Sequence, residues 1–126
     1  MATIDNKEFE RWVSESIDSL PEKYLSAMRN VAFIIEDNPT EEQRAKLRLS
    51  NHQTLFGLYE GIPLTARGMN YNLVLPDKIT IFKHPLESIS DSPEVIRARV
   101  RRTVWHEVAH HFGLGHGRIE ELQNKP

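Results

Sequence analysis

The sequence predicts a single domain, residues 1–126, that combines α-helices with a few short β-strands. Three observations predict this class. Stripes of apolar residues with helical spacing alternate with short apolar runs of strand length. The chain of 126 residues has the size of one compact domain with one core. Prolines and glycines separate the segments, and neither a repeat nor a linker interrupts them.

Composition limits the classes of partner. With 16 basic and 18 acidic residues the net charge is -2, so no overall field attracts nucleic acid or an anionic membrane. Cysteine is absent, which leaves histidine and carboxylates as the strong metal ligands. No signal segment opens the chain and no apolar run approaches a membrane span. We therefore expect a cytoplasmic protein without a membrane or nucleic-acid partner, and the oligomeric state stays open.

The first segment has the pattern of an amphipathic helix. Asp5 and Glu8 have the spacing of a capping box at its start. One helical stripe of this segment is apolar and predicts packing on the core; it consists of Phe9, Trp12, Val13, Ser16, Ile17 and Leu20. A short second helix is expected over residues 22–28.

Two strands are expected in the middle of the chain. The continuous apolar run 31–35 predicts a central strand that is buried on both faces. Residues 79–82 show a two-residue alternation and are mostly β-branched, which predicts another strand. Between them, Thr40 and Gln43 form a capping box that starts a charged, solvent-facing helix to about residue 49. Residues 55–64 predict an ordered loop with a short strand.

A long helix is predicted near the end of the chain. Ser92 is its expected cap, Pro93 takes the first helical position, and the helix runs to about Phe112. Four arginines lie in its middle, and with the acidic net charge they are interpreted as a solvated face rather than a nucleic-acid surface; they are Arg97, Arg99, Arg101 and Arg102.

The end of this helix carries a metal-binding pattern. His106 and His110 are one turn apart, about 40° around the axis, so both imidazoles can face one zinc ion. Glu107 can take a proton from zinc-bound water as a general base. Gly113 permits a left-handed turn that can bring His116 round as the third ligand. His111 points about 100° away from His110 and is interpreted as a packed or surface residue.

These residues match the pattern HExxHxxGxxH, the zinc signature of the metzincin metallopeptidases. The chain from about residue 9 onward resembles a small bacterial family of minimal zinc metallopeptidases, also in segments 55–64 and 75–82. The resemblance implies a minimal zincin-like α+β domain: a small mixed sheet packed on helices, including a long zinc-binding active-site helix. It also implies one zinc ion per chain, held by His106, His110 and His116, with Glu107 as the base.

Two further expectations come from this resemblance. The strand 79–82 should form the sheet edge above the zinc, where an extended peptide substrate could add by backbone hydrogen bonds. The methionine-bearing turn of the metzincins is absent, because only ten residues follow His116 and none is methionine. The chain therefore lacks the segment that builds their lower subdomain.

The leading hypothesis is a zinc-dependent metallopeptidase that hydrolyses peptide bonds of a peptide or protein substrate. Arg67, Tyr71 and His84 are the candidates for a second electrophile that stabilises the tetrahedral intermediate. The alternative enzyme is a metal-dependent endoribonuclease, because His-x3-His-x5-His also resembles the nuclease family of ribosomal RNA maturation. That family normally has glycine at the position of Glu107, which favours the peptidase. A non-catalytic zinc-binding module is the third hypothesis.

Overall fold

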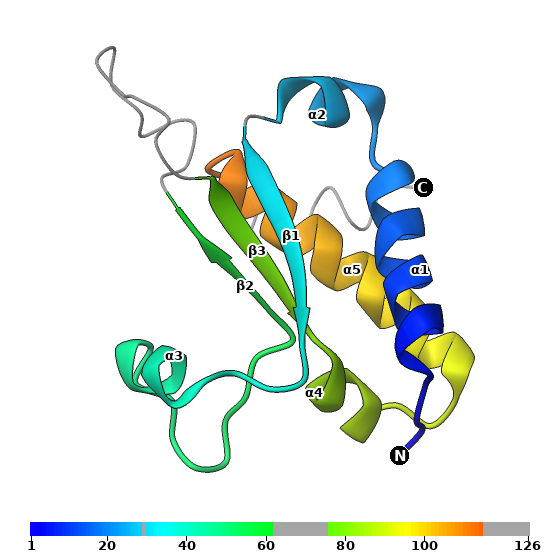
Figure 1. Cartoon of the computed structure of the whole chain (residues 1–126), viewed down its shortest axis with the longest axis vertical. Coiled ribbons are helices and arrows are strands. Elements are labelled where there is room, and N and C mark those ends of the chain that lie inside the picture. The colour runs from blue at the N-terminus through cyan, green and yellow to red at the C-terminus, as the bar shows by residue number, and fades with distance from the viewer. Residues whose placement is uncertain (29, 62–75, 115–126) are drawn as a thin grey trace.

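The computed structural model describes residues 1–28, 30–61 and 76–114. Helices and strands share this part of the chain, which confirms the predicted α+β class (Figure 1). No helix in these ranges has the length and apolar content needed to cross a membrane. The elements are, in order, α1 (Asn6–Asp18), α2 (Glu22–Ala27), β1 (Val31–Glu36), α3 (Glu41–Lys46), β2 (Gly57–Glu60), β3 (Asp77–Phe82), α4 (Lys83–Ser88) and α5 (Pro93–His111).

The three described strands form a mixed sheet with the order β1-β3-β2. Strand β3 pairs in parallel with β1 and antiparallel with β2. Two predictions about strand position are therefore wrong. The run 31–35 does form a strand, but it lies beside β3 at one side of this sheet and is only half-buried. The strand over 79–82 is central, so it is not the sheet edge.

These predictions failed because the apolar composition of a strand indicates only whether its two faces are buried. Strand order instead depends on which backbone groups are paired along the strand's two sides. Every residue of β3 except Lys78 is buried, as expected for a strand with a neighbour on both sides. Within the described sheet, the strand at the other side is β2.

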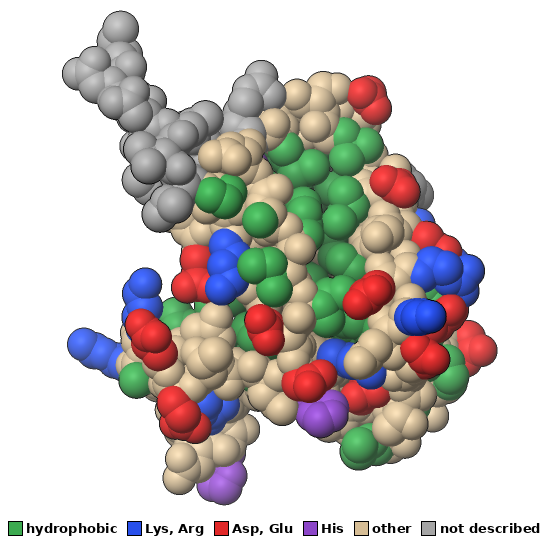
Figure 2. Space-filling model, viewed as in Figure 1, with side chains coloured by type: hydrophobic (Ala, Val, Ile, Leu, Met, Phe, Trp, Pro, Cys, Tyr) green, Lys and Arg blue, Asp and Glu red, His purple; other side chains and the backbone are tan. Residues whose placement is uncertain are grey.

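The core lies between the sheet and the two long helices. Ile79 and Ile81 of β3 face the apolar stripes of α1 and α5, and all of these side chains belong to one buried cluster. The predicted stripe of α1 is confirmed, because Phe9, Trp12 and Val13 are buried in that cluster. Figure 1 shows α1 lying alongside α5, and Figure 2 shows hydrophobic side chains filling the seam between β1 and α1. The core therefore occupies one side of α5.

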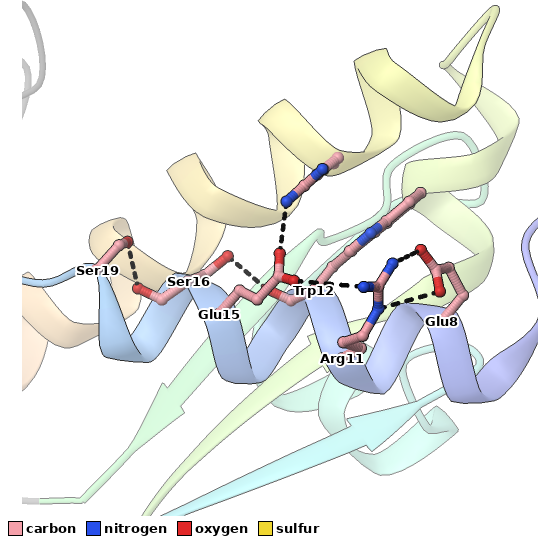
Figure 3. Close-up of polar contacts among 7 residues, drawn as sticks. Glu8, Arg11, Trp12, Glu15, Ser16 and Ser19 are labelled. Atoms are coloured by element: carbon pink, nitrogen blue, oxygen red, sulfur yellow. Dashed lines mark hydrogen bonds and ion pairs between the residues drawn. The ribbon is translucent and has the colours of Figure 1, made fainter.

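Polar contacts on the outer surface also join α1 to α5. Glu15 accepts a hydrogen bond of 2.7 Å from Arg97, so one of the four arginines belongs to a salt bridge between the helices (Figure 3). Arg11 pairs with Glu8 and lies 3.7 Å from Glu15. Exposed pairs of this kind add little stability. They agree with the interpretation of Arg97 as part of a solvated face.

The local helix signals are mostly confirmed. Thr40 and Gln43 form the predicted capping box at α3, although that helix ends at Lys46. The Ser92 side chain accepts from the backbone N–H of Val95 at the start of α5, with Pro93 in the first turn as predicted. Asp5 caps α1 by accepting from the backbone N–H of Lys7, but Glu8 pairs with Arg11 and no capping box forms.

The sequence did not predict α4, the short helix that follows β3. Its Glu87 is buried and accepts a hydrogen bond of 2.8 Å from the backbone N–H of Ile4. Lys83 donates to Asn6 and lies 4.0 Å from Glu87. Helix α4 thus ties the N-terminal segment to the end of the central strand. Its six residues are too few to show a helical period.

Candidate metal site and adjoining cleft

The last two turns of α5 bring His106, Glu107 and His110 together. Each residue offers one ligand atom, and these atoms all lie within 4.8 Å of one another. The imidazole rings of His106 and His110 have centroids 4.8 Å apart, as their i, i+4 spacing predicts. Two imidazole nitrogens and a carboxylate oxygen are a donor set that suits zinc. These residues therefore fit a metal ion.

The helix ends in the way the glycine in the motif predicts. Gly113 has φ of 77°, in the left-handed region that favours glycine. Its backbone N–H donates to His110, and that of Leu114 donates to Ala109, which is the hydrogen-bond pattern of a Schellman motif. The chain therefore turns back directly after the candidate metal ligands His106 and His110. His116, the predicted third ligand, lies outside the described residues.

Glu107 lies in a largely dry environment between α5 and β2. Its exposed fraction is 7%, and Gly57 of β2 packs directly against it. Burial raises the pKa of the Glu107 carboxyl to about 7, while a hydrogen bond from the backbone N–H of Tyr59 lowers it in part. A group with a pKa near neutrality can both accept and return a proton at physiological pH. The environment of Glu107 thus suits a general base.

A buried polar cluster lies directly behind this site. His111 is fully buried, and its Nδ1 lies 2.9 Å from Oδ2 of Asp77. The hydroxyl of Tyr59 donates to the same oxygen at 2.5 Å. Gly61 packs so closely on Asp77 that an added Cβ would lie 2.5 Å from its carboxyl group. The structure thus confirms that His111 is packed away from the His106–His110 face. The buried cluster around Asp77 links α5 to β2 and β3.

A cleft of about 790 Å³ opens beside His106 and Glu107. One wall is the segment 54–57 at the start of β2, and the other is the face of α5 that lies opposite it, from Val95 to Glu107. Arg99 and Arg102 line this second wall. The sequence interpretation assigned both arginines to a solvated face and missed the cleft. Their spacing could have placed them beside the site, since residues four and seven positions before His106 share its helix face.

Of the remaining predicted site residues, the structure describes His84 alone, and it is not brought to this cleft. Arg67 and Tyr71 lie outside the described residues. His84 is on α4, where its ring nitrogen lies 3.2 Å from the side-chain nitrogen of Asn38. It does not line the cleft beside Glu107. Among the described residues, Arg99 and Arg102 are the cations that do.

Comparison with known proteins places the chain in a family. The family described as zincin-like metallopeptidase matches residues 28–125, which is most of the chain. No curated protein matches. A solved structure, a conserved hypothetical protein from Thermo thermophilus, is similar in fold with a TM-score of 0.59. The two share 20% identity over 90% of this chain and 99% of the other, so this likeness supports the fold alone.

Proposed function

Because the chain belongs to the zincin-like metallopeptidase family, we propose that it is a zinc-dependent peptidase acting on a peptide or protein substrate. One observation carries the proposal: His106, Glu107 and His110 are grouped, and the first two of them line an open cleft. A structural zinc site has all four positions filled by protein, whereas a catalytic site keeps one open. A site that borders a cleft fits the second kind.

In this proposal His106 and His110 hold the metal, together with His116 as the third ligand. Zinc, when bound, polarises the scissile carbonyl and makes water a stronger acid. Three histidines without a thiolate accept other divalent ions as well. The family membership favours zinc among them.

Glu107 is proposed as the general base. Its carboxyl is buried at the end of the cleft, and the Tyr59 backbone N–H orients it. It takes the proton of the attacking water and passes it to the leaving amine, and in the metal-free protein burial raises the pKa of this carboxyl to about 7. Burial also keeps bulk water from competing for that proton.

Cleavage of a mixed peptide library tests the proposal. Zinc-loaded wild type is compared with zinc-loaded Glu107→Gln, which keeps the size of the side chain but removes the base. We expect the wild type to cut peptides and the variant to lose roughly 100-fold or more of the rate. Metal content, measured on the same samples, should be equal in both proteins.

Other outcomes would favour the other two hypotheses. RNA cleavage with intact peptides would support the endoribonuclease, and RNA affinity should then fall steeply with salt. Zinc binding that raises stability while neither polymer is cut would support a non-catalytic module. Equal peptide cleavage by wild type and Glu107→Gln would contradict the role of the carboxyl group.

A further inference from the structure

The face of α5 that lines the cleft with the candidate base carries two arginines. Arg99, Arg102 and His106 follow one another at spacings of three and four residues, so they form one stripe along the helix. All three line the same cleft as Glu107. With a rise of 1.5 Å per residue, Arg102 lies about 6 Å and Arg99 about 10 Å along the axis from His106. These spans correspond to two or three residues of an extended peptide.

The described lining of this cleft combines two guanidinium groups with apolar side chains. Glu107 is the one carboxyl group among the described lining residues, against two guanidinium groups. The rest of the lining is largely apolar, supplied mainly by Leu55, Phe56, Val95 and Ala98. A guanidinium binds a carboxylate through two parallel hydrogen bonds. Apolar walls beside such a group suit the stem of a glutamate or aspartate side chain.

We propose that Arg99 and Arg102 select substrates that carry a carboxylate within two or three residues of the scissile bond. This inference rests on the proposed function in that the ligand is a peptide. Carboxylate is favoured over the phosphates of RNA because the chain is acidic overall and a neighbouring arginine, Arg97, is paired with Glu15. The carboxylate can be an acidic side chain or the peptide's own C-terminus.

Binding tests the proposal without requiring turnover. The probes are fluorescein-labelled hexapeptide pools that differ only in Glu or Gln at one fixed position, each made with a free or an amidated C-terminus. The receptor is the full-length Glu107→Gln variant loaded with zinc. This variant is used because it should bind peptides without cutting them. We expect one Glu pool, or the free C-terminus, to bind roughly tenfold tighter than its neutral partner. The position at which this occurs identifies the source of the carboxylate.

Arginine variants assign the preference to the cleft. Arg99→Gln and Arg102→Gln, made in the Glu107→Gln background, should each lose most of that tenfold preference, and the double variant should lose it completely. Arg101→Gln is the matched control, because it removes the same charge from an exposed position of α5 that does not line the cleft. It should keep the preference. Gln and Arg have similar helix propensities, so all variants should retain the wild-type circular dichroism spectrum.

Three results would overturn the proposal. The first is equal binding of Glu and Gln pools at every position with no effect of C-terminal amidation. The second is a preference that the double variant keeps or that Arg101→Gln also loses. The third is displacement of the peptides by a single-stranded RNA whose affinity depends on Arg99 and Arg102, which would mark the cleft as a phosphate site. If carboxylate peptides bind selectively but wild-type protein never cuts them, the recognition site stands and the proposed peptidase function fails.

Discussion

At Glu107, burial and one backbone hydrogen bond act in opposite directions on the same carboxyl group. Removal from water disfavours the charged form, and the Tyr59 backbone N–H partly compensates. The larger effect is burial, which leaves the pKa at about 7. Burial of the Glu107 carboxyl therefore lowers the free energy of unfolding of the metal-free protein at neutral pH. Such a cost is expected where a residue serves chemistry rather than stability.

The pH dependence of unfolding tests this in the metal-free protein. In the unfolded chain the carboxyl has its ordinary pKa of 4.5, against about 7 when folded. Below pH 4.5 both states hold the proton, whereas between these values the unfolded state binds fewer protons. The free energy of unfolding should therefore fall as pH rises from 4.5 through 7, by up to about 3 kcal/mol from this residue.

Urea unfolding at pH 5 and at pH 8 measures the effect, with Glu107→Gln as the reference. The variant has no titrating group at this position, so the difference between the two proteins isolates the contribution of Glu107. The wild type should lose more stability than the variant on going to pH 8. The opposite order, or equal losses, would show that the carboxyl is not buried as described.

Among the elements, β2 and α5 define the site by how closely they approach. Gly57 is the point of contact: a Cβ there would lie 2.7 Å from Cγ2 of Thr103 and 3.0 Å from Cγ of Glu107. The absence of a side chain thus lets β2 pack against α5 next to the candidate base. The same strand supplies the backbone N–H that donates to Glu107.

Gly57→Ala should therefore move β2 away from α5. We expect a loss of about 1–3 kcal/mol of stability from overpacking, together with reduced peptide cleavage. The double variant Gly57→Ala/Thr103→Ser deletes the clashing methyl group and keeps the hydroxyl that donates to the Arg99 carbonyl. It should recover part of both losses in thermal unfolding and in cleavage assays. No recovery would place the strain somewhere other than at Thr103.

The elements that were predictable from the sequence are those that short-range signals specify. The Thr40 and Ser92 caps and the glycine turn after α5 depend on residues within one turn of each other, and all three are present. Strand order was not predictable in this way, because pairing between residues 31–36 and 77–82 depends on chain segments far apart in sequence. Helix α4 was missed because six residues carry no usable period.

In the candidate site too, only the contacts between residues close in sequence were predictable. The pairing of His106 with His110 follows from helix geometry, so the motif was sufficient to predict it, while the fold shows that Glu107 lies close to both. The wall of the cleft comes from segment 54–57, and the Asp77 partner of His111 lies 34 residues away in sequence. Neither contact is encoded locally. The spacing of Arg99 and Arg102 places them on the helix face of His106, but the tertiary fold is needed to show that this face borders a cleft.

On the scale of the whole molecule, a metal ion at the end of α5 would couple the site to the stability of the fold. The helix carries the candidate ligands and also contributes Ile96, Val100, Val104 and Val108 to the core. A ligand that binds only the folded state stabilises it by mass action. Metal binding should therefore be visible in unfolding as well as in activity.

Removal of zinc should lower the melting temperature. At free zinc about a thousandfold above the dissociation constant, the expected gain in stability is about 4 kcal/mol. His110→Ala should abolish the shift, and His52→Ala, which changes an exposed histidine outside the site, should keep it. Thermal unfolding with zinc or with a chelator measures this. A full zinc shift in His110→Ala would contradict the assignment of that residue as a ligand.

The most direct test of a zinc-dependent peptidase is the titration of zinc into metal-free protein while one cleavable peptide is followed. Cleavage should be absent without metal, rise in proportion to zinc, and level off at one ion per chain. Glu107→Gln should bind the same amount of zinc and show almost no cleavage along the whole titration. Cleavage by the metal-free protein, or an identical titration in the variant, would contradict the proposed function.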